Sequence, residues 1–233
     1  MQIKIVASGS DGNCYIVDDG ATKILIECGI KYKKIVKALD YDINSVSACI
    51  ISHSHSDHTL ACADLYSAGV DLYMPFDTAD EIKNKKFLCK MVSAGKQFKV
   101  GTFLIVPFEN NHYHSNGEPC TCYGYLLYSE KTEEKLLFAI DTAYIKPKFK
   151  ALDYIMIETN YISENIKDYD VAEVEKRRFI SHQSLETAID FLKTIDKSFL
   201  KCVYAIHLSK DRCDKDKVKS EIKKVVDCEV IVC

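Results

Sequence analysis

The sequence predicts an α/β domain in which sheets are covered by helices. Two observations favour this class. Segments rich in β-branched and aromatic residues, bounded by Gly, Asp or Ser, recur along the chain, and helical patterns lie between them. The first two-thirds of the chain is rich in strand patterns, whereas the last third alternates helix and strand.

Each predicted element is identified by its residue pattern. Strands are expected at residues 2–7, 14–17, 23–27, 48–52, 71–74, 102–108, 121–128, 135–140, 154–157, 201–206 and 228–232. Helices are expected at residues 32–39, 58–67, 78–85, 171–179, 184–195 and 215–226. With 233 residues, the chain is predicted to be a single domain spanning residues 1–233.

Composition excludes several classes of protein. The net charge of −3 gives no global positive field that would attract a polyanion. The 11 cysteines are scattered and odd in number, and the opening MQIKIVASGS lacks the apolar core of a secretory signal. No apolar run has the length of a membrane span. We therefore expect a cytoplasmic protein with free thiols that does not contact a membrane.

The segment ISHSHSDHTL carries the strongest chemical signal. His53 and His55 follow a predicted strand, where side chains two residues apart point the same way and could bind one ion. Asp57 and His58 stand at the start of the next predicted helix and could reach a second ion. A single histidine is usually a surface or core residue, but this cluster favours a metal site. Imidazole and carboxylate suit Zn²⁺, and also Mn²⁺ or Fe²⁺.

An HxHxDH motif after a strand resembles that of the metallo-β-lactamase fold hydrolases. The resemblance implies an αββα sandwich, with two mixed sheets packed face to face and helices outside. It also implies three further metal ligands, which stand in the segments PFENNH, LLFAIDTAY and VYAIHLS: His112, Asp141 and His207. One ion would be held by His53, His55 and His112 and the other by Asp57, His58 and His207, with Asp141 between them.

The resemblance covers nearly the whole chain. SGSDGN (residues 8–13) and ILIECG (residues 24–29) resemble the family's first hairpin, and the closest likeness is to a small, single-domain bacterial and phage exonuclease branch. Two positions depart from the family pattern. Glu27 stands where the family usually has an Asp that braces the metal loop, and Tyr113 stands where Asp is common. The first departure could loosen the support of the ligands.

Each implied ligand has an alternative interpretation. Asp141 could cap a turn after its strand, and His207 could be a core histidine at a strand end. His114 competes with His112 for the same role, and His112 is preferred for its place after PFENN.

Two further residues indicate phosphodiester chemistry. Glu158 and His182 resemble the Glu and His of the ribonuclease Z pattern, which implies a proton relay at the scissile phosphate. In that reaction a metal-bridging hydroxide attacks phosphorus, and a histidine steadied by a carboxylate protonates the leaving oxygen. The alternative is structural: Glu158 would end a strand and His182 would precede a helix.

The predicted function is therefore a metal-dependent hydrolase, specifically a phosphodiesterase or nuclease, with Asp57, Glu158 and His182 as catalytic residues. The substrate would be nucleic acid, short or single-stranded, or a small phosphodiester, and the cofactors two divalent ions, Zn²⁺ ahead of Mn²⁺ or Fe²⁺. Alternatives are a thioester or other carbonyl hydrolase with the same metals, and a non-catalytic metal-binding scaffold. Four basic clusters could contact phosphates, at residues 31–34, 83–86, 146–150 and 176–178, and the sequence favours none of them.

Overall fold

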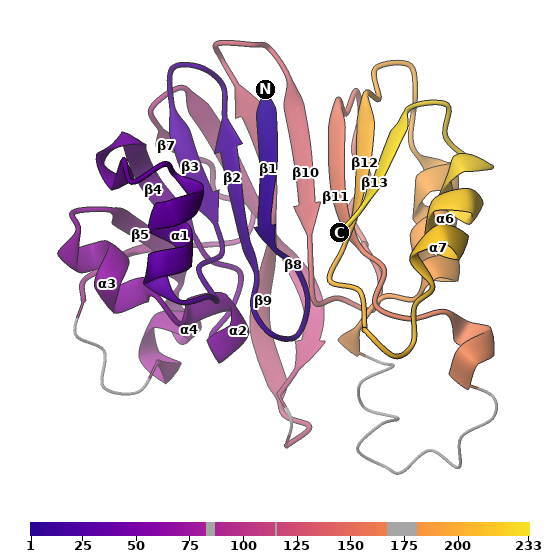
Figure 1. Ribbon diagram of the computed structural model, residues 1–233, viewed down its shortest axis with the longest axis horizontal. Coiled ribbons are helices and arrows are strands. Elements are labelled where there is room, and N and C mark those ends of the chain that lie inside the picture. The colour runs from indigo at the N-terminus through magenta and orange to yellow at the C-terminus, as the bar shows by residue number, and fades with distance from the viewer. Residues whose placement is uncertain (83–86, 115, 167–180) are drawn as a thin grey trace. The chain divides into compact units, whose positions relative to one another are not determined.

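The computed structural model describes residues 1–82, 87–114, 116–166 and 181–233 (Figure 1). The chain folds into two compact units. Unit 1 comprises Met1–Phe108 and Leu127–Glu134, and unit 2 comprises Glu109–Leu126 and Lys135–Cys233.

A six-stranded mixed sheet forms the centre of unit 1. Its strand order is β1 (Gln2–Ala7), β2 (Cys14–Asp18), β3 (Lys23–Ile26), β4 (Val46–Ile50), β5 (Asp71–Pro75) and β6 (Lys90–Val92). The first three strands pair antiparallel, and β3 to β6 pair parallel. The helices of this unit are α1 (Tyr32–Ala38), the 3-10 turn η1 (Ile43–Ser45), α2 (Ser56–Thr59), α3 (Cys62–Ser67) and α4 (Phe76–Glu81). Leu25, Ile35, Cys49, Leu65 and Leu72 belong to the buried cluster that joins strands and helices.

A seven-stranded mixed sheet contains the remaining strands. Its order is β13 (Glu229–Val232), β12 (Cys202–Ile206), β11 (Tyr154–Glu158), β10 (Lys135–Ala139), β9 (Pro119–Ser129), β8 (Phe103–Tyr113) and β7 (Phe98–Val100). Strands β10 to β13 are parallel to one another. Buried on both faces, β12 is apolar throughout, as is usual for a parallel strand under helices.

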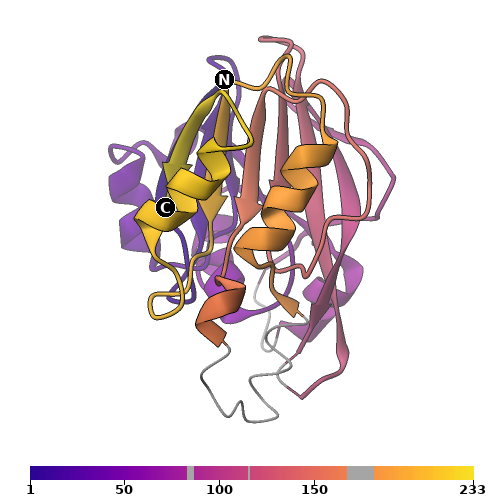
Figure 2. The ribbon, with the colours of Figure 1, turned by 90° about the vertical axis from the view of Figure 1, so that its right-hand side faces the viewer.

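Two amphipathic helices cover this parallel part of the sheet in unit 2. Helix α6 (Leu185–Thr194) and helix α7 (Lys215–Lys223) lie side by side, and α7 packs against β13 (Figure 2). Ser184 begins α6 by accepting a hydrogen bond from the Thr187 N–H, and Asp214 caps α7 in the same way. A short 3-10 turn, η2 (Ser163–Ile166), follows β11.

The predicted strands all coincide with observed ones, with ends that differ by a few residues. The single helix expected at residues 58–67 is wrong, because the chain forms two short helices, α2 and α3, there. The three-residue strands β6 and β7 were not predicted, because a pattern that short has no readable period. The helix expected at 171–179 lies outside the described residues.

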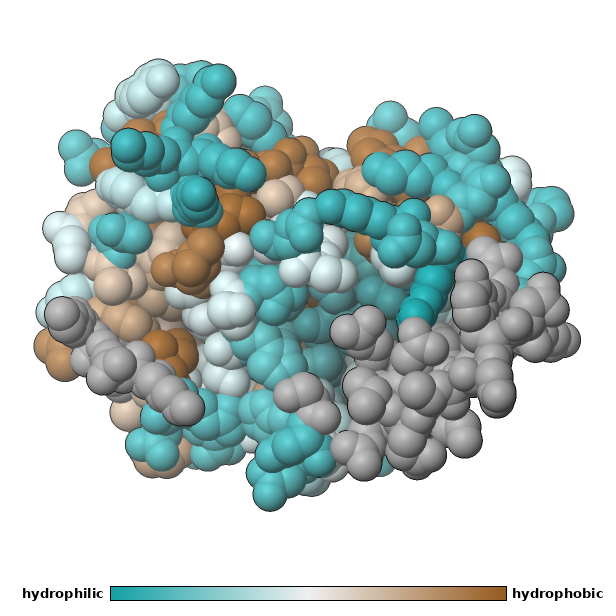
Figure 3. All heavy atoms as spheres, turned by 60° about the horizontal axis from the view of Figure 1, so that its bottom comes forward, coloured by the Kyte–Doolittle hydropathy of each residue, from teal (hydrophilic) through white to brown (hydrophobic). Residues whose placement is uncertain are grey.

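Among residues that the structure describes, none of the helices has the length and apolarity needed to cross a membrane. On the face drawn in Figure 3, hydrophilic side chains cover most of the surface and hydrophobic ones form separate patches.

Candidate metal centre

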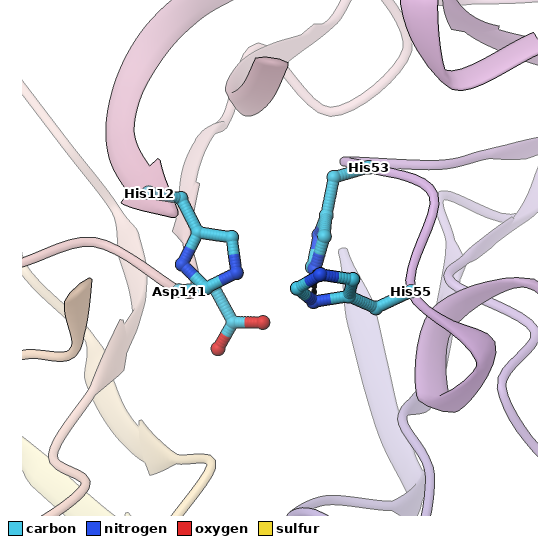
Figure 4. Close-up of side chains that lie close together, drawn as sticks. All are labelled: His53, His55, His112 and Asp141. Carbon is cyan, nitrogen blue, oxygen red and sulfur yellow. Dashed lines mark hydrogen bonds between the residues drawn. The ribbon is translucent and has the colours of Figure 1, made fainter. Parts of the chain in front are cut away.

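The loop after β4 brings two histidines of unit 1 together. Nε2 of His53 lies 2.9 Å from Nδ1 of His55, and Figure 4 draws this pair on the loop. On the other side of its ring, His53 Nδ1 lies 2.9 Å from the Ser52 hydroxyl. Two nitrogens at this separation could bind one ion, since Zn–N bonds measure about 2.0–2.1 Å.

Asp57 and His58 lie on α2, immediately after this pair. His55 is the N-cap residue of α2. The His58 ring is fully buried, and its centroid lies 4.2 Å from that of His53. Nε2 of His58 lies 3.3 Å from Oδ2 of Asp57. The four residues of the HxHxDH motif therefore form a compact group of nitrogen and oxygen donors within unit 1.

Close backbone packing fixes the position of α2. The Asn13 N–H donates to Asp57 O at 2.8 Å, and the Cys28 N–H donates to His58 O at 2.9 Å. A Cβ atom built on Gly29 would lie 1.6 Å from Asp57 O and 2.5 Å from His58 N. Only glycine allows this approach, so the segment that follows β3 holds the motif directly.

Glu27 occupies the bracing position despite its extra methylene group. It is fully buried with φ of +61°, a left-handed conformation that is uncommon for a residue other than glycine. Its Oε1 accepts a hydrogen bond from the Ser52 N–H at 3.1 Å, and its Oε2 lies 3.3 Å from His58 Nδ1. Burial raises the pKa of Glu27, and contact with His58 and Ser52 opposes that rise. Glu27 thus contacts both ends of the histidine loop.

In unit 2, three neighbouring strands deliver three candidate site residues to one edge. Asp141 follows β10, Glu158 ends β11 and His207 follows β12. These strands are adjacent and parallel, so their carboxyl ends meet at the same edge. Asp141 and His207 adopt left-handed φ angles of 48° and 56°, as Glu27 does. Such conformations concentrate at functional sites.

Asp141, Glu158, His182 and His207 form one cluster. Their ligand atoms all lie within 4.8 Å of one another. His207 Nδ1 lies 3.1 Å from Asp141 Oδ1 and 2.8 Å from Glu158 Oε1. His182 Nδ1 lies 3.3 Å and 2.7 Å from the same two oxygens. We call these residues the carboxylate–histidine cluster.

The buried charges of this cluster shift one another's pKa values. Burial opposes the charged form of Glu158, but the neighbouring His182 and His207 outweigh that effect and lower its pKa. Burial also opposes a charged His182, but Glu158 and Asp141 raise its pKa to about 10. The His182 side chain is 18% exposed, whereas those of Asp141, Glu158 and His207 are at most 3% exposed. His182 is therefore the accessible member of the cluster.

His112, rather than His114, lies beside this cluster within unit 2. The His112 ring is buried, lies edge-on to the His182 ring at 5.6 Å, and has Nδ1 3.2 Å from the Ser181 carbonyl oxygen. Figure 4 draws it at the end of β8. His114 lies beyond the end of β8, and its backbone N–H donates to Glu118 O. This placement favours His112 over His114 as a site residue.

Three supporting residues were missed from the sequence. The side-chain amide of Asn13 lies 3.3 Å from His58 Nε2, Ser52 contacts His53, and the Asn160 amide donates to His207 O at 2.9 Å. Asn13 and Asn160 are each more than 40 positions from the histidine they contact. No local pattern marks them, although Asn160 stands two residues after Glu158 at a strand end.

The donors in both units fit a divalent metal ion. Neutral imidazoles and carboxylates are ligands of Zn²⁺, Mn²⁺ and Fe²⁺, and the carboxylate–histidine cluster sets two anionic groups against two imidazoles in a buried volume. A divalent ion bound here would balance the negative charge of the two buried carboxylates. The assignment of particular ligands to particular ions stays a prediction.

Comparisons with known proteins identify the family. The family model described as the beta-lactamase superfamily domain matches residues 22–208. The fold resembles that of the metallo-beta-lactamase fold protein YhfI from Bacillus subtilis, with a TM-score of 0.76, 18% identity, and coverage of 99% of this chain and 95% of that one. The chain therefore belongs to the beta-lactamase superfamily, and the predicted fold class is confirmed.

Two curated relatives match along most of their length. Exodeoxyribonuclease WalJ of Streptococcus pneumoniae is 28% identical over 228 residues, which cover 91% of this chain and 83% of that protein. Exodeoxyribonuclease YycJ of Bacillus anthracis is 23% identical over 239 residues, covering 97% of this chain and 89% of that protein.

Proposed function

We propose that this protein is a dinuclear-metal-dependent phosphodiesterase that acts as a nuclease on DNA. The observation that carries the proposal is the carboxylate–histidine cluster, in which an accessible His182 is paired with a buried Glu158 beside two candidate metal ligands, Asp141 and His207. The two relatives named exodeoxyribonucleases support DNA as the substrate.

The proposed metal ligands are the seven residues of the family pattern. His53, His55 and His112 would hold one ion, Asp57, His58 and His207 the other, and Asp141 both. Zn²⁺ is the proposed ion, with Mn²⁺ and Fe²⁺ as alternatives that suit the same donors. When bound, the two cations would stabilise the negative charge that develops on the phosphate and supply a nucleophile at neutral pH.

The chain's own residues would then position the proton that the leaving oxygen needs. Glu158 holds the His182 ring by a 2.7 Å contact to Nδ1. Glu158 is itself fixed, because its Oε2 accepts hydrogen bonds from the N–H groups of Thr142 at 3.0 Å and Gln183 at 3.3 Å. In this arrangement the partly exposed His182 acts as the general acid.

Substrate selection tests the proposal. Protein loaded with Zn²⁺ or Mn²⁺ is offered single- and double-stranded DNA, RNA, a chromogenic phosphodiester and a thioester, with Asp141→Asn as the inactive control. We expect DNA and the phosphodiester to be hydrolysed and the control to lose about 10³-fold or more. Faster turnover of the thioester would favour the carbonyl hydrolase instead. Inactivity on every substrate, with well below one metal ion bound per chain, would favour a scaffold.

A further inference from the structure

A short segment of unit 2 begins directly after Asp141 and alternates in exposure. Residues 142–150 form neither helix nor strand. From residue 143 onward, every second side chain is half-buried: Ala143, Ile145, Pro147 and Phe149. The intervening side chains are exposed: Tyr144, Lys146, Lys148 and Lys150. One side of the segment thus presents an aromatic ring followed by three ammonium groups.

Both ends of the segment contact other residues of unit 2, the start by hydrogen bonds and the end by a ring contact. At its start, the Thr142 N–H donates to Glu158 Oε2 at 3.0 Å, and the Thr142 hydroxyl donates to Tyr144 O at 2.8 Å. At its end, the Phe149 ring contacts the Phe191 ring of α6 edge-on, with centroids 6.5 Å apart. The position of Tyr144 is therefore tied to the same carboxylate that orients His182.

The local sequence favours an open chain between these anchors. Pro147 has a fixed φ and no N–H, and it restricts the preceding Lys146 to extended conformations. In an open chain, second-neighbour residues lie about 6–7 Å apart on one side. The three lysines therefore follow one another in a row rather than clustering around one point.

The exposed side of the segment has the chemistry of a nucleic-acid contact. Among the described residues, no ion pair engages Lys146, Lys148 or Lys150. Tyr144 is 46% exposed, and an aromatic face offers stacking to an unpaired base. Of the other basic clusters, 83–86 and 176–178 lie outside the described residues, and the cluster at 31–34 lies on unit 1, at the N-cap and in the first turn of α1.

We propose that Tyr144, Lys146, Lys148 and Lys150 form a binding strip for single-stranded nucleic acid, which leads the strand to the carboxylate–histidine cluster. The lysines contact successive phosphates and Tyr144 stacks on a base near the scissile bond. A single strand is favoured over a duplex because only unpaired bases expose their faces to a tyrosine ring. The proposal rests on the proposed function, since it assigns a substrate form to that site.

Binding to metal-free protein tests the strip without any cleavage. The test variant K146E/K148E/K150E is compared with K31E/K33E/K34E, which changes the net charge by the same amount on unit 1. Fluorescence anisotropy with labelled oligo-dT and oligo-U separates DNA from RNA. We expect the strip variant to bind at least about tenfold more weakly. The slope of log binding constant against log salt concentration should be smaller in magnitude by about 2. The control should stay within about twofold of wild type, and Tyr144→Ala should weaken binding about fivefold or more while Tyr144→Phe retains it.

Three outcomes would contradict the proposed binding strip. They are equal binding by wild type and K146E/K148E/K150E, an equal loss in K31E/K33E/K34E, and tighter binding of a duplex than of the single strand. Thermal unfolding confirms that each variant is folded. In metal-loaded protein, K146E/K148E/K150E should lose activity on both substrates unequally. Its loss of activity on an oligonucleotide should exceed its loss on a chromogenic phosphodiester at least tenfold. A wild type that cleaves neither substrate would refute the proposed function, while the anisotropy would still test the strip.

Discussion

Nδ1 of His182 lies 2.7 Å from Oε1 of Glu158, the shortest of the four imidazole–carboxylate contacts in the carboxylate–histidine cluster. Glu158 is fully buried at the end of β11, and His182 stands just before α6 on a separate part of the chain. The carboxylate thus fixes the ring of the most exposed residue of the cluster.

This contact predicts a leaving-group effect. His182→Ala should slow hydrolysis of esters with poor leaving groups about 10²-fold or more, because their oxygen needs a proton, and should slow nitrophenolate esters much less. Kinetics on a series of phosphodiesters with leaving groups of increasing pKa measures this. Glu158→Gln should reproduce the same trend more weakly. Equal losses along the series would assign His182 a structural role.

The contacts of Glu27 predict that its substitution lowers the affinity of the protein for metal. It contacts His58 and the Ser52 N–H from a buried position, so Glu27→Gln should weaken metal binding about 10–100-fold without removing a ligand. Competition with a chromogenic chelator measures the affinity. Glu130→Gln, an exposed residue of unit 1 paired with Lys99, is the matched control and should not change it. Unchanged affinity in Glu27→Gln would show that Glu27 does not support the ligands.

The close approach of Gly29 to α2 predicts that a side chain at this position destabilises the protein. Gly29→Ala should lower the free energy of unfolding by about 3 kcal/mol or more, because its Cβ would overlap the backbone of Asp57 and His58. Gly20→Ala is the control: its Cβ meets nothing within 4 Å, and its φ of +85° should cost about 1 kcal/mol. Denaturant titration compares them. Similar losses in both variants would contradict the packing of α2 against Gly29.

Much of the candidate site could be predicted from the sequence, because its residues stand directly after apolar strand patterns. The HxHxDH motif and the segments around Asp141 and His207 all follow apolar strands, and the structure places Asp141, Glu158 and His207 at the ends of three adjacent parallel strands. The left-handed backbone at Glu27, Asp141 and His207 was not predictable, because only a few per cent of non-glycine residues have positive φ, even though Asp and His are enriched among them. The break between α2 and α3 was also hidden, since apolar spacing continues across it.

Asp19 predicts an acid-dependent loss of stability in unit 1. Burial opposes its charge, but hydrogen bonds from Ser129 and Thr102 and from the N–H groups of Thr22 and Ala21 lower its pKa. The pKa of Asp19 in the folded protein is below its unfolded value of about 3.9. Ionised Asp19 therefore stabilises the fold fully above that value, and this stabilisation is lost as pH falls through the folded pKa.

The measurement for Asp19 is the difference in unfolding free energy between wild type and Asp19→Asn as a function of pH. The difference should be constant from neutral pH to about pH 5 and should shrink below about pH 4. Asp18→Asn, a neighbouring residue with an exposed hydrogen bond to the Gly20 N–H, should change stability less. A difference that grows as pH falls would contradict the assigned direction of the pKa shift.

The central claim is that phosphodiester hydrolysis requires two metal ions held by this chain. Titration of metal-free protein with Zn²⁺ or Mn²⁺, while hydrolysis of single-stranded DNA is followed, tests it most directly. The proposed ligand set predicts activity that rises to a plateau at about two ions per chain, and no plateau above background in Asp141→Asn. Full activity in metal-free protein, or a plateau at one ion per chain, would contradict the claim.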